Sequence, residues 1–316
     1  MIDAHHHLWD PRAREYDWLL GDQPWASDEE LARLRRAFTL AELAPLAAGA
    51  GATGTVVIQT VNDEWETRDL LALAAGTDPY GNRGGEGGGP GGVVPPGAPV
   101  PNLLAGVVGW VDLAAPGVED AVAQLRVQPG GSFLCGIRHP LMGEPSSWLT
   151  QPEVRRGLGA LAKEGLCFDV VLLPHQLEAT VTAVRSVPEL CVVLDHMGAP
   201  PVDSEGLAGG GAASEAWARV ARDLGGLPNV TCKLSGMHSV SVRASTLRPF
   251  YDTLLEAFGP DRLMFGSDWP VSSLVAPYGE VCALYQELTA DLGADERDAV
   301  FDRTARRVYR LSTHPG

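Results

Sequence analysis

The stretch CFDVVLL at residues 167–173, followed by QLEATVTAVRSV at 176–187 and CVVLDH at 191–196, contains the pattern that decides the fold. A short run of apolar and β-branched residues predicts a buried strand, and the longer amphipathic segment after it predicts a helix. The next apolar run predicts a second strand. This order predicts two parallel strands joined by a helical crossover.

The same unit recurs along the whole chain. Runs that predict strands lie at 1–5, 54–61, 104–112, 134–139, 167–173, 191–196, 230–235 and 263–268. Segments that predict helices lie between them and after the last, at 40–48, 64–75, 118–127, 152–164, 176–187, 214–224, 245–258 and 279–292, with a final helix at 294–309. Eight near-continuous apolar strands favour an α/β fold of the closed (β/α)8 TIM-barrel type, because both strand faces must be buried. We expect the final helix to close the barrel.

Length and composition predict one domain over residues 1–316, since barrels of this type often reach this size as one unit. A hydrophobic fraction of 45% supplies a large core. The low-complexity segment GNRGGEGGGPGGVVPPGAPVP at 81–101 is too poor in apolar side chains to pack, so it predicts a flexible insertion. Its place after a helix and before a strand predicts the barrel face opposite the active site.

The charge balance excludes several classes of partner. The sequence has 24 Lys plus Arg against 40 Asp plus Glu, which gives a formal net charge of −16. Such a chain is not expected to bind nucleic acid or anionic membranes. The N-terminus lacks the features of a signal peptide and no apolar run has transmembrane length, so we expect a cytoplasmic location. Five widely spaced cysteines indicate neither a disulfide framework nor a thiolate zinc site.

Polar residues stand where the predicted strands end. In a parallel barrel these carboxyl ends meet in one mouth, where barrel enzymes keep their chemistry. The residues collected in this way are His5 and His7, Arg138 and His139, Asp195 and His196, and Asp268. Two or more imidazoles, a guanidinium and a carboxylate are therefore predicted around one cavity.

Within the run His5-His6-His7, strand alternation turns the first and third side chains into the mouth and the second away from it. Two imidazoles at this spacing can hold either one metal ion or one oxyanion. Asp268, in the string FGSDWP, is predicted to be a general base or a metal ligand. Arg138 is open to two interpretations, a substrate contact or a structural ion pair.

Several strings together resemble the amidohydrolase superfamily, in particular its group of sugar lactonases and dicarboxylate lactone hydrolases. They are IDAHHHLWD at 2–10, VVIQT at 56–60, GIRHP at 136–140, VVLDHMGAPP at 192–201, CKLSGM at 232–237 and FGSDWPV at 265–271. The resemblance implies a barrel of the metal-dependent-hydrolase type. By motif it assigns His5 and His7 to the paired histidines, His196 to the sixth strand and Asp268 to the acid of the eighth.

The resemblance also implies a reaction. Members of this group hydrolyse aldonolactones such as fucono-, rhamnono- or galactonolactone, or pyrone and muconolactone rings. Members with two metals carry a lysine at the end of the fourth strand, where this chain has Arg138-His139, so a two-metal site is not expected. One Zn²⁺ or other divalent ion on His5, His7 and Asp268, with His175 as a further ligand, remains one alternative, and metal-independent catalysis remains the other.

The functional hypothesis is therefore a lactonase with a small-molecule lactone as its substrate. Asp268 is expected to take a proton from the attacking water, and His5, His7 and His196 are the other catalytic candidates. The residues expected to bind substrate are Arg138, His139, Trp110, His238 and Trp269. The alternatives are a zinc-dependent decarboxylase of the same superfamily and a non-catalytic barrel that binds sugar acids. The sequence predicts no oligomeric state.

Overall fold

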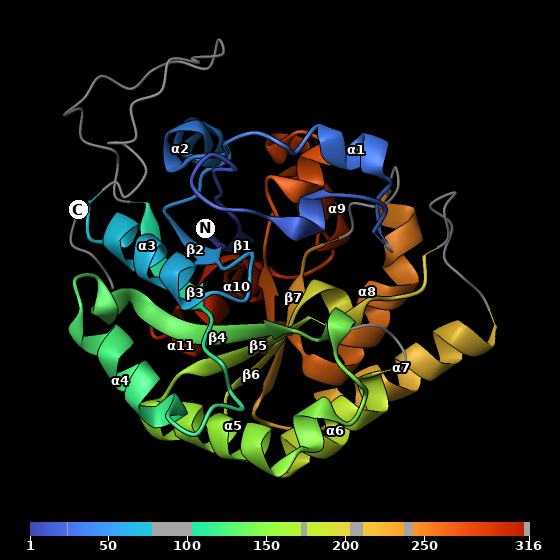
Figure 1. Cartoon of the computed structure of the whole chain (residues 1–316). Coiled ribbons are helices and arrows are strands. Elements are labelled where there is room, and N and C mark those ends of the chain that lie inside the picture. Colours follow the sequence, from blue (N-terminus) through green and yellow to red (C-terminus); the bar gives the residue numbers. More distant parts are fainter. Residues whose placement is uncertain (24, 78–102, 172–175, 203–210, 237–242, 313–316) are drawn as a thin grey trace.

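The computed structural model describes residues 1–23, 25–77, 103–171, 176–202, 211–236 and 243–312. The eight predicted strands are present and form one parallel sheet in chain order, rolled into a near-closed barrel (Figure 1). They are β1 (Ile2–His6), β2 (Gly54–Ile58), β3 (Leu104–Gly109), β4 (Leu134–Pro140), β5 (Cys167–Val171), β6 (Val192–Leu194), β7 (Val230–Leu234) and β8 (Leu263–Phe265). The (β/α)8 TIM-barrel prediction is confirmed. The insertion predicted at 81–101 lies outside the described residues.

The helices that follow the strands surround the barrel (Figure 1). They are α2 (Leu40–Gly49), α3 (Glu64–Ala74), α4 (Val118–Val127), α5 (Pro152–Glu164), α6 (Leu177–Arg185), α7 (Ala212–Gly225), α8 (Ala244–Phe258) and α9 (Tyr278–Leu288). The chain then continues through α10 (Ala294–Asp298), a π-helical turn (Ala299–Arg303) and α11 (Thr304–Val308), so the predicted additional C-terminal helix is confirmed. Among the described residues, every helix is too short or too polar to cross a bilayer.

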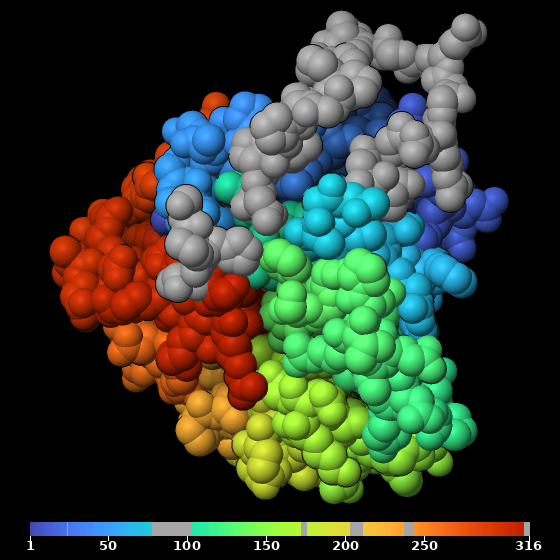
Figure 2. All heavy atoms as spheres, turned by 90° about the vertical axis from the view of Figure 1, so that its left-hand side faces the viewer, coloured from blue at the N-terminus to red at the C-terminus, as the bar shows by residue number. Residues whose placement is uncertain are grey.

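Two hydrophobic cores hold these layers together. The larger core packs the outward side chains of the strands against the surrounding helices. The smaller one fills the barrel interior with alternate residues of the strands, such as Val56, Ile58 and Val193, and includes Tyr309 and Leu311 from the C-terminal end. The C-terminal segment therefore plugs the barrel at the end opposite the mouth. Figure 2 shows this segment in red, beside the α4 and α5 region in green.

The strand β1 does not alternate strictly. Ile2 and Ala4 belong to the barrel interior, so uninterrupted alternation would place His6 there as well. The pairing of β1 with β2 is instead irregular between Asp3 and His6. This irregularity lets His5 and His7 face the mouth and leaves His6 on the other side, with its Nε2 3.0 Å from Thr55 Oγ1.

A long excursion separates β1 from α2, and the sequence analysis assigned no elements to it. It contains a 3₁₀ turn (Asp17–Leu19) and the short helix α1 (Asp28–Ala32). Trp9 anchors it, because its indole is 1% exposed and its Nε1 donates a hydrogen bond to the Leu34 carbonyl at 3.1 Å. Trp18 packs edge-on against Trp9, with ring centroids 5.1 Å apart.

Two glycines of α5 give a matched test of its packing. A Cβ atom at Gly157 would lie 2.3 Å from the backbone oxygen of Leu113, whereas a Cβ at Gly159 meets nothing within 4 Å. We expect Gly157→Ala to lower the free energy of unfolding by about 1–3 kcal/mol through overpacking. Gly159→Ala should raise it by up to about 1 kcal/mol through helix propensity. Urea unfolding measures both, and equal stabilities for the two variants would contradict the observed packing.

Candidate active site

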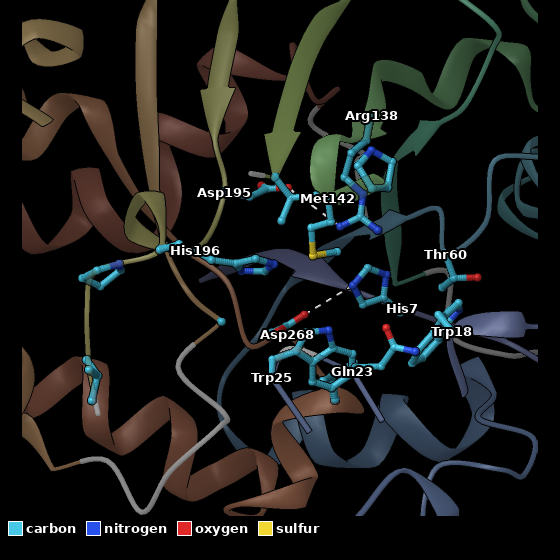
Figure 3. Close-up of a pocket in the computed structure, with 17 residues that line it drawn as sticks. His7, Trp18, Gln23, Trp25, Thr60, Arg138, Met142, Asp195, His196 and Asp268 are labelled. Atoms are coloured by element: carbon cyan, nitrogen blue, oxygen red, sulfur yellow. Dashed lines mark ion pairs between the residues drawn. The ribbon is translucent and has the colours of Figure 1, made fainter. Parts of the chain in front are cut away.

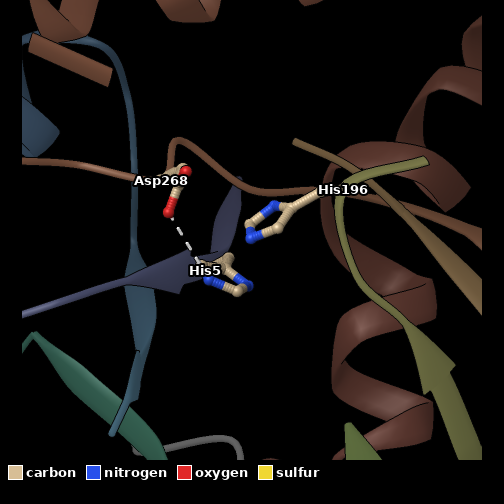
Figure 4. A group of neighbouring side chains, drawn as sticks. All are labelled: His5, His196 and Asp268. Atoms are coloured by element: carbon tan, nitrogen blue, oxygen red, sulfur yellow. Dashed lines mark ion pairs between the residues drawn. The ribbon is translucent and has the colours of Figure 1, made fainter. Parts of the chain in front are cut away.

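His5, His7 and Asp268 converge at the mouth of the barrel. His5 Nε2 and His7 Nε2 lie 3.2 Å apart, and Asp268 Oδ1 lies 3.5 Å from the first and 3.3 Å from the second. His196 joins them, since one of its ring nitrogens, one of His5 and an oxygen of Asp268 all lie within 4.8 Å of one another (Figure 4). The structure thus brings together all four residues that the sequence analysis named as catalytic candidates.

The backbone at this site is held in an uncommon conformation. Asp268 has a φ of +56° and His196 a φ of +54°, both in the left-handed region that residues other than glycine rarely adopt. Strain of this kind concentrates at functional sites. Two glycines make the necessary room, because a Cβ at Gly236 would lie 2.1 Å from His196 Nδ1, and one at Gly266 would lie 2.5 Å from His5 Cβ.

Asp3 links the first strand of the barrel to the segment after the last strand, just below the site. Its Oδ1 accepts hydrogen bonds from the backbone amides of Ser267 at 2.8 Å and His5 at 3.2 Å. Its Oδ2 accepts from Ser267 Oγ at 2.7 Å and from the Tyr278 hydroxyl at 3.1 Å. Burial raises the pKa of Asp3 to about 6, although these donors oppose the rise. Asp3 therefore has a structural role, linking β1 to the segment after β8.

The tautomer of His7 follows from its contacts. His7 Nδ1 lies 2.9 Å from the carbonyl oxygen of Ile58, which can only accept a hydrogen bond. Nδ1 therefore carries the proton, and Nε2 presents a lone pair toward His5 and Asp268. Burial lowers the pKa of His7, so the ring is neutral near pH 7.

A cluster of buried charges lies behind His5. The Lys233 ammonium is 2.6 Å from Asp169 Oδ2 and 3.0 Å from Asp195 Oδ1, and all three side chains are fully buried. Arg138 Nη1 lies 3.8 Å from Asp195 Oδ2. Two cations and two carboxylates balance one another, which is the condition under which charges can be buried.

The cluster determines the charge of its members. Burial by itself would lower the pKa of Lys233, but Asp169 and Asp195 raise it above its ordinary value. Burial would raise the pKa of Asp195, but Lys233 and His5 hold it well below the usual range. The pKa of His5 lies well below its ordinary value because of burial and of Lys233 beside it. At pH 7 the lysine and Asp195 are therefore charged and His5 is neutral.

Above these residues lies a cavity of about 350 Å³. His7, Arg138, Asp195, His196 and Asp268 form its polar floor (Figure 3). The rest of the lining is mostly aromatic and aliphatic, and comprises Trp18, Gln23, Trp25, Thr60, Pro140, Met142, Val171, Ala199, Pro200, Val202, Gly236 and Val271. A polar floor under apolar walls is the arrangement of a small-molecule site.

Three residues expected to bind substrate do not line this cavity. Trp269 is 3% exposed and packs edge-on against Phe38, so its ring belongs to the core. Trp110 Nε1 donates a hydrogen bond to His139 Nδ1 at 3.1 Å, and the His139 ring stacks on Trp148. The Trp269, Trp110 and His139 rings therefore contact other side chains of the protein and not the cavity.

The remaining predicted residues divide into two groups. Arg138 lines the cavity, while its Nε donates to Gln59 Oε1 at 3.0 Å and its Nη1 faces Asp195. The ion pair is therefore present, and the substrate contact stays a prediction. His175 and His238 lie outside the described residues. For these two, the expected roles stay predictions.

The sequence analysis missed the aromatic wall formed by Trp18 and Trp25. Both belong to the excursion after β1, which has no periodicity from which to infer its course. The tryptophans at such short spacing were the available signal, since this residue type is common in binding sites. No such signal points to Lys233, because its place in the charge cluster depends on three strands that no local pattern brings together.

His5, His7 and Asp268 fit one divalent ion. Four donors around a tetrahedral zinc ion at about 2.0–2.1 Å lie about 3.3 Å from one another. The three separations of 3.2, 3.3 and 3.5 Å match this value. Two imidazoles and one carboxylate are also a donor set that zinc accepts at catalytic sites.

The structure is thus a (β/α)8 barrel with one histidine on the first strand, another directly after it and an aspartate after the eighth strand. The chain belongs to the amidohydrolase family, whose profile matches residues 2–311. This confirms the resemblance seen in the sequence.

Relatives extend over the whole chain. The L-fucono-1,5-lactonase of Burkholderia ambifaria is 31% identical, with 100% of this chain and 97% of the relative covered. The L-fucono-1,5-lactonase of Burkholderia multivorans is 32% identical over 98% of this chain and 96% of its own. A crystal structure of an amidohydrolase from Burkholderia multivorans with bound zinc is 32% identical, covers 98% of this chain and 99% of its own, and superposes with a TM-score of 0.80.

The Asp3 contacts predict a large effect on stability. Asp3→Asn should lower the free energy of unfolding at pH 7.5 by roughly 1.5–3 kcal/mol, because an amide nitrogen replaces one buried acceptor that faces only donors. The matched control is Asp291→Asn, which removes an exposed ion pair with Arg248 and should cost less than about 1 kcal/mol. Urea unfolding compares the two, and similar losses would contradict the role given to Asp3.

Proposed function

We propose that this protein is a lactonase that opens the ring ester of a small lactone, with a sugar aldonolactone as the substrate. The observation that carries the proposal is the convergence of Asp268 with His5, His7 and His196 on the floor of one cavity. Similarity over the whole chain to two L-fucono-1,5-lactonases supports it.

Asp268 acts as the general base in this proposal. Its carboxylate accepts a proton from the attacking water and then delivers it to the ring oxygen that leaves. A ring nitrogen of His196 lies within 4.8 Å of an Asp268 oxygen. From there His196 stabilises the negative charge that develops on the carbonyl oxygen of the lactone. When bound by His5, His7 and Asp268, one zinc ion would supply Lewis-acid polarisation of the carbonyl.

The cavity supports an uncharged substrate. Arg138 is the cation of the described lining, and its charge already faces Asp195 while its guanidinium donates to Gln59. A substrate carboxylate would gain little from Arg138, because this guanidinium already has Asp195 and Gln59 as partners. A neutral ring that lies against Trp18 and Trp25 suits these surroundings better than a dicarboxylate does.

Replacing Asp268 tests the base. Asp268→Asn should lower kcat by at least about 10²-fold, since a positioned general base contributes about 10²–10⁴ in rate. The control is Asp112→Asn, another carboxylate placed after a strand, which is exposed and accepts a hydrogen bond from Ala114. Steady-state hydrolysis measures both variants, with circular dichroism to verify the fold. Turnover close to wild type in the Asp268 variant would remove it from the mechanism.

The aromatic wall predicts a different kinetic signature. Trp25→Ala should raise KM by about 5–30-fold and change kcat much less, because it removes apolar contact that ground state and transition state share. Trp65→Ala serves as the matched control, since Trp65 is 69% exposed and does not line the cavity. A fall in kcat at unchanged KM in the Trp25 variant would assign it another role.

The decisive assay follows acid release with a pH indicator over a panel of aldonolactones. Each lactone is tested with protein as purified, after chelation, and after zinc is restored. We expect hydrolysis of at least one neutral aldonolactone, with activity lost on chelation and recovered with zinc. Carbon dioxide release from a carboxylated aromatic acid, without lactone hydrolysis, would favour a decarboxylase instead. Binding of sugar acids without any turnover would identify a non-catalytic barrel.

A further inference from the structure

Two oppositely charged groups compete for one nitrogen of His5. Its Nδ1 lies 3.1 Å from Lys233 Nζ and 3.3 Å from Asp195 Oδ1. The ammonium can only donate a hydrogen bond and the carboxylate can only accept one. The neutral imidazole can satisfy one of them at a time, depending on which ring nitrogen carries its proton.

If Lys233 donates to His5 Nδ1, the proton of His5 must lie on Nε2. That proton then points to His7 Nε2 at 3.2 Å, which is an acceptor because His7 Nδ1 donates to Ile58. Lys233, His5, His7 and the Ile58 carbonyl thus form a complete chain of hydrogen bonds. In this arrangement His5 Nε2 has no lone pair to offer a metal ion.

If His5 donates from Nδ1 to Asp195, its Nε2 has a lone pair beside His7 Nε2 and Asp268 Oδ1. A carboxylate behind a histidine is the usual support for a metal-ligating imidazole. Lys233 keeps Asp169 as its hydrogen-bonded partner, at 2.6 Å, and Asp195 remains 3.0 Å away. The same set of residues therefore provides for both tautomers without moving a side chain.

We propose that Lys233 and Asp195 are positioning residues that select the tautomer of His5, and that they therefore change the zinc affinity of the site in opposite directions. Lys233 favours the tautomer with the proton on Nε2, and Asp195 favours the metal-ligating one. The inference rests on the zinc site named under the proposed function. It adds two residues that act on the ion through His5 rather than as ligands of it.

The surroundings make these two partners rigid. Lys233 lies on β7, Asp169 lies on β5 and Asp195 directly follows β6, and these three strands are adjacent. All three side chains are fully buried. Asp169 also accepts a hydrogen bond from the Tyr309 hydroxyl at 2.5 Å. Tyr309 thereby fixes the carboxylate that binds Lys233, from the end of the barrel opposite the mouth. The His5, Lys233 and Asp195 side chains are 0% exposed, and the described polar contacts of His5 Nδ1 are with Lys233 and Asp195.

Nitrogen NMR of the metal-free protein labelled with ¹⁵N-histidine tests the tautomer directly. We expect wild-type His5, assigned from its absence in His5→Asn, to show a protonated Nε2. In Lys233→Met the donor to His5 Nδ1 is gone. The His5 proton should therefore move from Nε2 to Nδ1, from which it can be donated to Asp195. A protonated Nδ1 in the wild type, or an unchanged tautomer in Lys233→Met, would overturn the proposal. This readout requires neither lactone hydrolysis nor zinc, so its failure is distinguishable from that of the proposed function.

Zinc affinity, measured by competition with a chromogenic chelator, gives the second test. Asp195→Asn should weaken binding by about 10–100-fold, as is typical for the loss of an outer partner of a metal ligand. Lys233→Met should tighten it by about tenfold. The matched control is Asp169→Asn, which removes the same charge beside the same lysine but has no described contact with His5, and it should change affinity less than about threefold.

These variants separate tautomer selection from a structural role. If the cluster only maintains the fold, Lys233→Met and Asp195→Asn should both weaken zinc binding, and that result would refute the inference. Equal losses in Asp195→Asn and Asp169→Asn would show that net charge alone acts, which would also refute it. Should Lys233→Met fail to fold, the wild-type tautomer and the comparison of the two aspartates still decide the question.

Discussion

The junction between the first and last strands is the constraint on which the rest of the molecule depends. β1 and β8 are distant in sequence, and the Asp3 carboxylate, Ser267 and Tyr278 fasten them together with buried hydrogen bonds. Backbone hydrogen bonds from Asp268 to the His5 carbonyl and from His7 to the Trp269 carbonyl, both 2.7 Å long, continue the junction upward. The same residues that close the barrel thereby bring two imidazoles against one carboxylate. The contacts that close the barrel are therefore also the contacts that position the site.

Much of this arrangement could be predicted from the sequence. Repeated strand and helix patterns determine the barrel because apolar runs of this kind must be buried on both faces. Once the fold is a parallel barrel, residues at the strand ends are close together whatever their separation in sequence, which is why His5, His196 and Asp268 could be grouped in advance. Their roles as catalysts or ligands stay predictions, because geometry alone does not measure a rate.

Other features depend on interactions that no local pattern records. Strand alternation predicted that His5 and His7 face the mouth, but the irregular pairing that lets them do so above an inward Ile2 and Ala4 arises between two strands rather than within one. Trp18 and Trp25 are brought over the cavity by a segment without periodicity, while Trp269, beside a predicted catalytic residue, is drawn into the core by Phe38. Adjacency in sequence to Asp268 was thus a poor guide to the wall of the pocket.

The segment of α11 and Tyr309 supports the site from the end of the barrel opposite the mouth. The Tyr309 hydroxyl completes the contacts of Asp169, and the Cys167 thiol donates to the Val308 carbonyl. Deleting residues 308–312 would remove both partners, and Asp169 would keep Lys233 as its hydrogen-bonded neighbour. The charge cluster behind His5 would then lose part of its support although no residue of the mouth had changed. Damage at the far end of the barrel is therefore transmitted to the histidines through buried hydrogen bonds.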